Sequence, residues 1–185
     1  MRRRSFLAVA AATLAAPRLA RAETGSAHGF RFESLDAEGG EIALSDFAGR
    51  PVLVVNTASR CAFTPQYEAL QDLWDAYRDR GLAVIGAPSR DFGRQEYAEA
   101  SKIKEFCEVN FAIDFPMTRL VKVKGRDAHP FYAWAAREGD FAAPRWNFHK
   151  YLLDGSGRLV GAWGSQTGPT DPEILSAIEP HLPAS

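Results

Sequence analysis

Two cysteines carry the chemistry that this sequence of 185 residues could perform. Cys61 follows a valine-rich run at residues 51–57 (PVLVVNT) and precedes a segment with helical periodicity. A loop between a strand and a helix N-terminus lies near the positive end of the helix dipole, which favours a thiolate. In α/β proteins the same end of the sheet is where ligands bind. Cys61 is therefore predicted to be a reactive nucleophile rather than an inert buried thiol.

The second cysteine, Cys107, follows Ile103 by one helical turn, so the periodicity predicts that its side chain faces the core. Taken alone, this pattern is typical of a structural cysteine. The 46 positions between the two cysteines exclude a Cys-x-x-Cys motif. No spacing between the cysteines and His129 or His149 fits a zinc site, so no metal or other cofactor is expected.

The elements around Cys61 are predicted to form a β-α-β unit. Residues 51–57 and 82–87 are apolar runs typical of strands buried on both faces of a parallel sheet. Thr64 is the predicted N-cap of the helix between them, with Pro65 in its first turn and Gly81 at its end. The apolar positions of this helix recur at helical spacing at Tyr67, Leu70, Leu73, Trp74 and Tyr77.

The remaining elements complete one α/β domain at residues 23–185, without a linker or an internal repeat. An N-terminal β-hairpin is predicted at residues 30–35 and 41–44, and a second hairpin at 148–153 and 159–163. Further helices are predicted at residues 97–109 and 129–138 and from Asp171 onward. The expected architecture is a mixed sheet flanked by helices.

Charge is distributed unevenly along the chain. Five of the 22 basic residues fall within residues 1–22, where there is no acid, and the rest of the chain carries 17 basic against 23 acidic residues. This acidic balance disfavours a nucleic-acid partner. Residues 1–22 combine a basic start, a short apolar run and the sequence Ala20-Arg21-Ala22, as in a cleavable signal peptide. Arg3 and Arg4 add a twin-arginine pattern, so export to the periplasm or the exterior is expected.

The segment around Cys61 resembles the active-site segment of the glutathione peroxidase family. Residues 49–64 (GRPVLVVNTASRCAFT) match it at every diagnostic position, and four downstream motifs follow in the same order. These are residues 92–96 (FGRQE), 115–117 (FPM), 128–130 (AHP) and 145–150 (RWNFHK). The resemblance covers residues 30–182. It implies a thioredoxin-like fold and the reduction of hydroperoxides to water or alcohols, as in a response to oxidative stress.

The same resemblance implies a catalytic tetrad of Cys61, Gln95, Trp146 and Asn147. The indole N–H and the two amides donate hydrogen bonds without adding charge, so they can stabilise a thiolate and orient a peroxide. Considered singly, Gln95 would be a loop residue, Trp146 a core or interface aromatic and Asn147 a turn former. Their assignment to the site therefore depends on the family pattern.

The chain departs from the family pattern at residues 86–93 (GAPSRDFG), where relatives usually read GFPCNQFG. Arg90 and Asp91 place two charges near the predicted nucleophile. The sequence leaves open whether they pair with each other, tune Cys61, alter substrate access or are merely solvated. Ser89 replaces a cysteine found in many relatives, so Cys107 is the only other thiol in the chain.

Cys107 falls where thioredoxin-using members of the family carry a resolving cysteine, so the resemblance implies this role. It would condense with a Cys61 sulfenic acid to form a disulfide. The sulfurs would then have to approach each other, which could require unwinding of the helix. A permanent structural disulfide between the two cysteines in an oxidising compartment is the alternative.

The expected partners are a hydroperoxide and a thiol reductant, either a thioredoxin-like protein or glutathione. The carboxylates of glutathione would need cations at the site, for which the candidates are Arg60, Arg90, Arg94, Arg145 and Lys150. Only a short segment separates the third predicted helix from Trp146, so the long loop of tetrameric relatives is missing and the resemblance implies a monomer. Two other functions stay open, a thiol-disulfide oxidoreductase acting on proteins and a redox sensor or adaptor.

Overall fold

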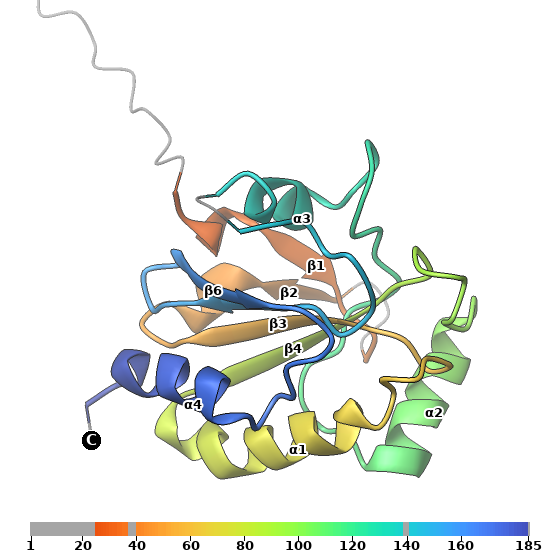
Figure 1. The fold of residues 1–185 in the computed structure, drawn as a ribbon, viewed down its shortest axis with the longest axis horizontal. Helices are drawn as coiled ribbons and strands as arrows, with labels where there is room; N and C mark the ends of the chain where they lie inside the picture. Colours follow the sequence, from red (N-terminus) through yellow and green to blue (C-terminus); the bar gives the residue numbers. More distant parts are fainter. Residues whose placement is uncertain (1–24, 37–39, 139–140, 185) are drawn as a thin grey trace, which may run out of the picture.

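The computed structural model describes residues 25–36, 40–138 and 141–184, so the predicted signal peptide at residues 1–22 lies outside the described residues. A four-stranded sheet with the strand order β4-β3-β5-β6 forms its centre (Figure 1). The strands are β3 (Val52–Thr57), β4 (Ala83–Pro88), β5 (Lys150–Leu153) and β6 (Leu159–Trp163). The β3 and β4 strands are parallel, whereas β5 is antiparallel to both β3 and β6. The mixed sheet confirms the predicted α/β architecture.

Every residue of β3 and β4 is buried, because apolar layers cover both faces of the sheet. On one face lie α1 (Gln66–Tyr77), α2 (Ala100–Phe111) and α4 (Pro172–Ile178), whose apolar side chains form one core cluster with alternate strand residues such as Leu53 and Leu152. On the other face, α3 (Pro130–Ala135) and the N-terminal hairpin form a second cluster with Val54 and Tyr151. Figure 1 shows α1 and α4 together on one side of the sheet and α3 on the opposite side.

The N-terminal hairpin is confirmed, as a separate two-stranded sheet of β1 (Arg31–Glu33) and β2 (Glu41–Ala43). Residues 116–118 connect it to the free edge of β4. The Gly86 N–H donates to the Pro116 carbonyl at 2.9 Å, and the Leu35 N–H donates to the Met117 carbonyl at 2.8 Å. The FPM motif therefore fastens the hairpin to the main sheet.

The helix boundaries differ from those predicted. The α2 helix begins at Ala100 rather than at Tyr97, whose N–H instead binds the Glu96 carboxylate at 2.8 Å. The α3 helix is shorter than predicted at both ends. His129 stands outside it as the N-cap and accepts a hydrogen bond from the Phe131 N–H, and the helix ends at Ala135. The α4 helix starts at Pro172, as predicted. Within the described ranges, no helix is long and apolar enough to cross a bilayer.

Candidate active site

Cys61 lies in a loop of tight turns between the end of β3 and the start of α1. The Cys61 N–H donates to the Thr64 hydroxyl at 2.9 Å, and this hydroxyl donates to the Ala58 carbonyl at 2.9 Å. Thr64 therefore joins the two sides of the loop. The prediction that Thr64 caps α1 is wrong, because Pro65 precedes the helix in a helical conformation and no side-chain cap is present.

The Cys61 thiol is free, and its residue is 8% exposed. Its Sγ accepts a hydrogen bond of 3.5 Å from the Phe63 N–H, the only hydrogen bond to this sulfur found in the described part of the chain. The loop thus holds the sulfur close to the surface with a donor in place.

Gln95 is fixed beside Cys61 by its backbone. Gly93 and Arg94 both adopt left-handed conformations, with φ of 63° and 52°, and turn the chain back toward the Cys61 loop. The Gln95 carbonyl then accepts a hydrogen bond of 2.9 Å from the N–H of Arg60, the residue that precedes Cys61. For a non-glycine residue such as Arg94 this conformation costs about 1 kcal/mol or more, and such strain concentrates at functional sites.

Asn147 meets Gln95 from the opposite side of the loop. Its side chain is fully buried, and its Nδ2 donates to Gln95 Oε1 at 2.9 Å. Asn147 Oδ1 is buried without a hydrogen-bond partner among the described residues. A buried amide oxygen without a hydrogen-bond partner is energetically costly. Oδ1 is therefore available to accept a hydrogen bond from a group that enters the site.

Asn56, which the sequence analysis missed, positions the segment that carries Trp146 and Asn147. Its Nδ2 donates to the Trp146 carbonyl at 3.1 Å, and its Oδ1 accepts the His149 N–H at 3.1 Å. Its backbone carbonyl accepts the N–H of Phe148, a residue with the left-handed φ of 61°. The signal was present, because Asn56 is an amide in a strand of otherwise apolar and β-branched residues.

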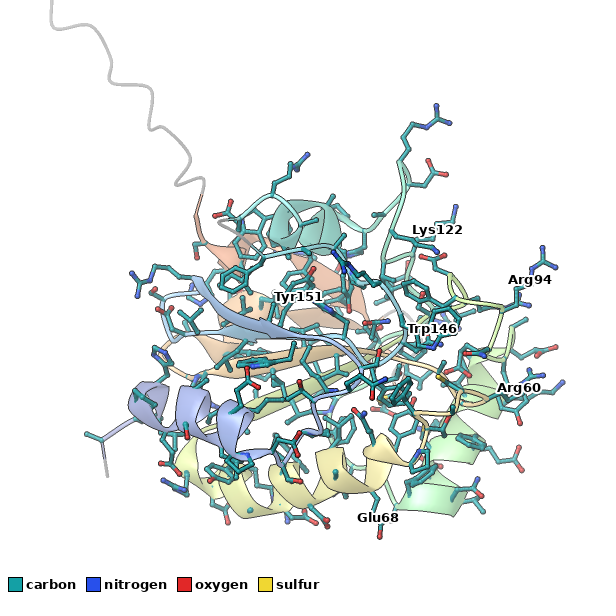
Figure 2. All side chains as sticks on the ribbon, viewed as in Figure 1. Arg60, Glu68, Arg94, Lys122, Trp146 and Tyr151 are labelled. Atoms are coloured by element: carbon teal, nitrogen blue, oxygen red, sulfur yellow. The ribbon has the colours of Figure 1, made fainter. Side chains whose placement is uncertain are left out.

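The Trp146 indole covers the surface at this end of the molecule. It is 41% exposed, and its ring packs against Phe92 at a centroid distance of 5.6 Å, with the ring planes tilted by 45°. Figure 2 shows Trp146 at the same end of the molecule as Arg60 and Arg94. Of the predicted tetrad residues, Gln95 and Asn147 are thus directly hydrogen-bonded to each other. Trp146 is held through its backbone carbonyl, which accepts the hydrogen bond from Asn56.

Comparison with known proteins identifies the family of this chain. The family model for glutathione peroxidase matches residues 30–136. This chain belongs to the glutathione peroxidase family. It is therefore a peroxidase, an oxidoreductase that uses a hydroperoxide substrate and a thiol reductant.

Individual relatives agree with this family. A hydroperoxy fatty acid reductase of Synechocystis sp. is 41% identical over 164 residues, which cover 84% of this chain and 95% of the relative. A glutathione peroxidase of Lactococcus lactis is 37% identical over 147 residues, covering 78% and 94%. The crystal structure of a glutathione peroxidase from T. cruzi has a TM-score of 0.64 at 28% identity and covers 84% of this chain and 95% of that one. The thioredoxin-like fold is confirmed.

In this peroxidase, Arg90 and Asp91 do not pair with each other. Asp91 Oδ2 accepts hydrogen bonds from the backbone N–H groups of Val123 and Lys124, at 2.7 and 3.2 Å. Arg90 is exposed. Of the possibilities that the sequence left open, mutual pairing is therefore excluded. Asp91 instead fastens the loop at residues 121–124 through its side chain.

Glu96 is a second residue that the sequence analysis missed. It has no exposed surface, and its Oε1 accepts the Tyr97 N–H at 2.8 Å. Burial raises the pKa of this carboxyl above its usual value. A fully buried acid directly after Gln95 is thus built into the wall of the site, although an isolated Glu in a loop gives no such signal in the sequence.

Cys107 lies on the buried face of α2, as its periodicity predicted. It is a free thiol, 2% exposed, and belongs to the same core cluster as Cys61. Burial raises the pKa of the Cys107 thiol to about 12. In this conformation Cys107 is protonated at neutral pH, and it becomes a nucleophile only when its surroundings change.

Lys150 cannot bind a substrate carboxylate as the sequence suggested, because it has no exposed surface. The exposed basic candidates are Arg60, Arg90, Arg94 and Arg145. No cluster of three or more His, Cys, Asp or Glu residues that could hold a metal ion occurs in the described segments.

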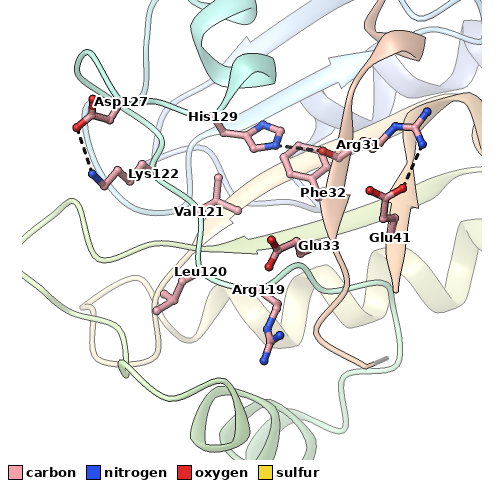
Figure 3. Close-up of a pocket in the computed structure, with 10 residues that line it drawn as sticks. All are labelled: Arg31, Phe32, Glu33, Glu41, Arg119, Leu120, Val121, Lys122, Asp127 and His129. Atoms are coloured by element: carbon pink, nitrogen blue, oxygen red, sulfur yellow. Dashed lines mark hydrogen bonds and ion pairs between the residues drawn. The ribbon is translucent and has the colours of Figure 1, made fainter. Parts of the chain in front are cut away.

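A pocket of about 420 Å³ lies away from these residues, between β1 and the segment at residues 119–129 (Figure 3). Two ion pairs join residues that line this pocket, Arg31 with Glu41 at 3.1 Å and Lys122 with Asp127 at 3.3 Å. His129 lines it, with Nε2 3.1 Å from the Arg31 carbonyl. None of the four tetrad residues contributes to its wall.

Proposed function

We propose that Cys61 is the peroxidatic nucleophile of this peroxidase, and that Gln95, Trp146 and Asn147 are the hydrogen-bond donors of its site. The observation that carries the proposal is the contact between Asn147 and Gln95, whose backbone in turn binds the residue next to Cys61. Two uncharged amides are thereby held in a half-buried contact beside the loop that carries Cys61. Preorganised donors of this kind stabilise charge that develops in a transition state.

The reaction begins with attack of the Cys61 thiolate on one oxygen of the hydroperoxide. The O–O bond breaks, Cys61 becomes a sulfenic acid and the second oxygen leaves as an alkoxide or hydroxide. A proton must reach this leaving group, which then departs as an alcohol or as water. Cys61 loses two electrons and the peroxide gains them.

Cys107 is the proposed resolving thiol. Its sulfur attacks the Cys61 sulfenic acid, a disulfide forms, and the hydroxyl of the sulfenic acid leaves as water with the proton of the Cys107 thiol. The step requires α2 to open, because Cys107 is buried. Opening removes few side chains from the core, because Ile103 and Cys107 are the two buried residues of α2.

The proposed reductant is a thioredoxin-like protein, with glutathione as the alternative. A dithiol partner attacks the Cys61–Cys107 disulfide, leaves both cysteines as thiols and becomes a disulfide itself. With glutathione, the first thiol would attack the sulfenic acid directly and Cys107 would be structural. A thiol-disulfide oxidoreductase acting on proteins is less well supported, since the chain lacks a vicinal cysteine pair.

Turnover of an organic hydroperoxide tests the proposal, measured as NADPH oxidation with either the thioredoxin or the glutathione system. We expect turnover with thioredoxin, none for Cys61→Ser, and a loss for Cys107→Ser that glutathione does not restore. Equal turnover of the Cys107→Ser variant with thioredoxin would exclude Cys107 as the resolving thiol. Turnover by the Cys61→Ser variant would refute the assignment of the nucleophile.

We also propose that residues 1–22 export the protein and are cleaved after Ala22, leaving a monomeric periplasmic or secreted enzyme at residues 23–185. The basic start, the apolar run and the twin-arginine pattern support this address. Replacement of Arg3 and Arg4 by lysine should retain the precursor in the cytoplasm, as measured by cell fractionation and N-terminal mass. Unchanged export would exclude the twin-arginine route.

A further inference from the structure

Lys150 is a lysine without any exposed surface, at the first position of β5. Its Nζ donates to Gln66 Oε1 at 2.5 Å, to the Thr167 carbonyl at 2.6 Å and to the Gly164 carbonyl at 3.5 Å. Within the described ranges it forms no ion pair with a carboxylate. The ammonium therefore donates to three neutral oxygens. These hydrogen bonds, rather than a salt bridge, compensate for the burial of its charge.

The three acceptors belong to two elements that pack on one face of the sheet. Gln66 is the first residue of α1, which directly follows the Cys61 loop, and Gly164 and Thr167 lie in the loop between β6 and α4. Figure 1 shows α1 and α4 side by side on this face. Lys150 therefore fastens the N-terminus of α1 and the β6–α4 loop to β5.

From Gln66 the hydrogen bonds continue to Asn147. Gln66 Nε2 donates to the Ser165 carbonyl at 2.5 Å, and the Ser165 hydroxyl donates to the Asn147 carbonyl at 2.6 Å. In the other direction, the Gln66 N–H donates to the Phe63 carbonyl at 2.9 Å. Phe63 is the residue whose own N–H binds Cys61 Sγ.

These contacts join the two sides of Cys61 in a continuous path. Asn147 binds Gln95, and the Gln95 carbonyl binds the Arg60 N–H. The path therefore runs from Phe63 on one side of the nucleophile, through Gln66, Ser165 and the tetrad amides, to Arg60 on the other. Within this path, the Gln66 side chain connects α1 to the β6–α4 loop, and Lys150 donates a hydrogen bond to that side chain.

We propose that Lys150 is a positioning residue of the peroxidase, which fixes Asn147 relative to Cys61 through Gln66 and Ser165. The inference rests on the proposed roles of Cys61 and Asn147. Removal of the ammonium would leave Gln66 Oε1 and two backbone carbonyls buried without donors, so the α1 end and the β6–α4 loop would rearrange. Asn147 would then lose its fixed position, and a misplaced donor no longer stabilises the thiolate or the leaving group.

The charged groups around Lys150 support a measurable pH dependence. Burial lowers the pKa of Lys150 to about 7, while Asp171 at the start of α4 acts to raise it. His149, the neighbouring residue in the chain, has its own pKa lowered by burial and by Lys150. Deprotonation above neutrality removes one donor, so the path weakens as the pH rises through about 7.

The test uses the mature chain with Cys107→Ser, so that Cys61 is the only thiol. Into it are placed Lys150→Met, Ser165→Ala, the two together, and the exposed control Lys102→Met. The rates of Cys61 alkylation by iodoacetamide and of oxidation by an organic hydroperoxide are measured against pH, with thermal unfolding as a check. Ser165→Ala breaks the link to Asn147 without touching Lys150, which keeps the test decisive if Lys150→Met fails to fold.

We expect Lys150→Met and Ser165→Ala each to slow both reactions by about tenfold, the double variant to be no slower than the slower single one, and Lys102→Met to match the parent. The parent's pH profiles should contain a component centred near pH 7 that is absent from Lys150→Met. Unchanged rates in the folded single variants, even with a loss of stability, would overturn the inference. If the parent fails to react with hydroperoxide, the proposed function falls, while the alkylation rates still decide the role of Lys150.

Discussion

Asn147 Nδ2 donates a hydrogen bond of 2.9 Å to Gln95 Oε1, joining two residues that lie 52 positions apart in the chain. The two residues come from different parts of the fold, since Gln95 follows β4 and Asn147 precedes β5. The contact closes the wall of the Cys61 site. A glutamine after a left-handed turn and an asparagine in a buried position are thereby held as a single unit.

Replacement of Gln95 by alanine should slow the oxidation of Cys61 by an organic hydroperoxide about 100-fold, because Asn147 loses its partner and the site loses a donor. Stopped-flow fluorescence measures this rate. The matched control is Gln166→Ala, an exposed glutamine, which should react like the parent. Equal rates for both variants would remove Gln95 from the site.

Replacement of Trp146 by phenylalanine keeps an aromatic ring on Phe92 but removes the indole N–H. Since the side chain is 41% exposed, stability should change by less than about 1 kcal/mol, while the peroxide rate falls about tenfold. Trp163→Phe is the control, because its indole binds Glu173 at 2.8 Å. An unchanged rate of peroxide reduction in Trp146→Phe would mean that the indole N–H has no role and that the ring only shields the site from solvent.

The variant Asp91→Ala should lose about 1–3 kcal/mol of unfolding free energy, because the Val123 and Lys124 N–H groups lose their acceptor. Denaturant unfolding of this variant and of Arg90→Ala separates the two charges. The exposed Arg90 should be neutral to stability. A stable Asp91→Ala variant would show that the loop holds without this carboxylate.

His149 should make the protein less stable in mild acid. Burial lowers its pKa to about 4, whereas the unfolded residue takes up a proton near pH 6.5. Between these values the unfolded chain binds more protons, so stability is lost as the pH falls from about 6.5 to about 4, by roughly 3 kcal/mol at most. The variant His149→Phe should flatten this part of the curve. An unchanged slope in urea unfolding would assign it to other groups.

The residues that the sequence located correctly are those whose surroundings are local. The apolar runs of β3 and β4 and the Pro172 start of α4 follow from periodicity and capping. The prediction for Thr64 was wrong because a threonine that cross-links a loop has the same spacing in the sequence as an N-cap. The start of α2 was misplaced because Tyr97 lies under the Arg60 guanidinium, 4.1 Å from the ring centroid, which is a tertiary contact.

Cys61 follows from its position between a strand and a helix, whereas Gln95, Trp146 and Asn147 follow only from the family pattern. The residues that support them were not predicted. Lys150 was counted among exposed cations, because lysines are seldom fully buried and the sequence does not reveal the three oxygens that hold this one. Asn56 gave a signal that could have been used, as an amide in an apolar strand. The partners of Asp91 lie 32 and 33 positions away, beyond the reach of local patterns.

The most direct test of the two-cysteine cycle is peptide mass spectrometry on the reduced mature protein after one equivalent of an organic hydroperoxide, without any other thiol. We predict a rapid Cys61–Cys107 disulfide, and a trapped Cys61 sulfenic acid in the Cys107→Ser variant. A sulfenic acid without the disulfide in the unchanged protein would contradict the role of Cys107 and favour glutathione. An unreacted Cys61 would contradict the account of the nucleophile itself.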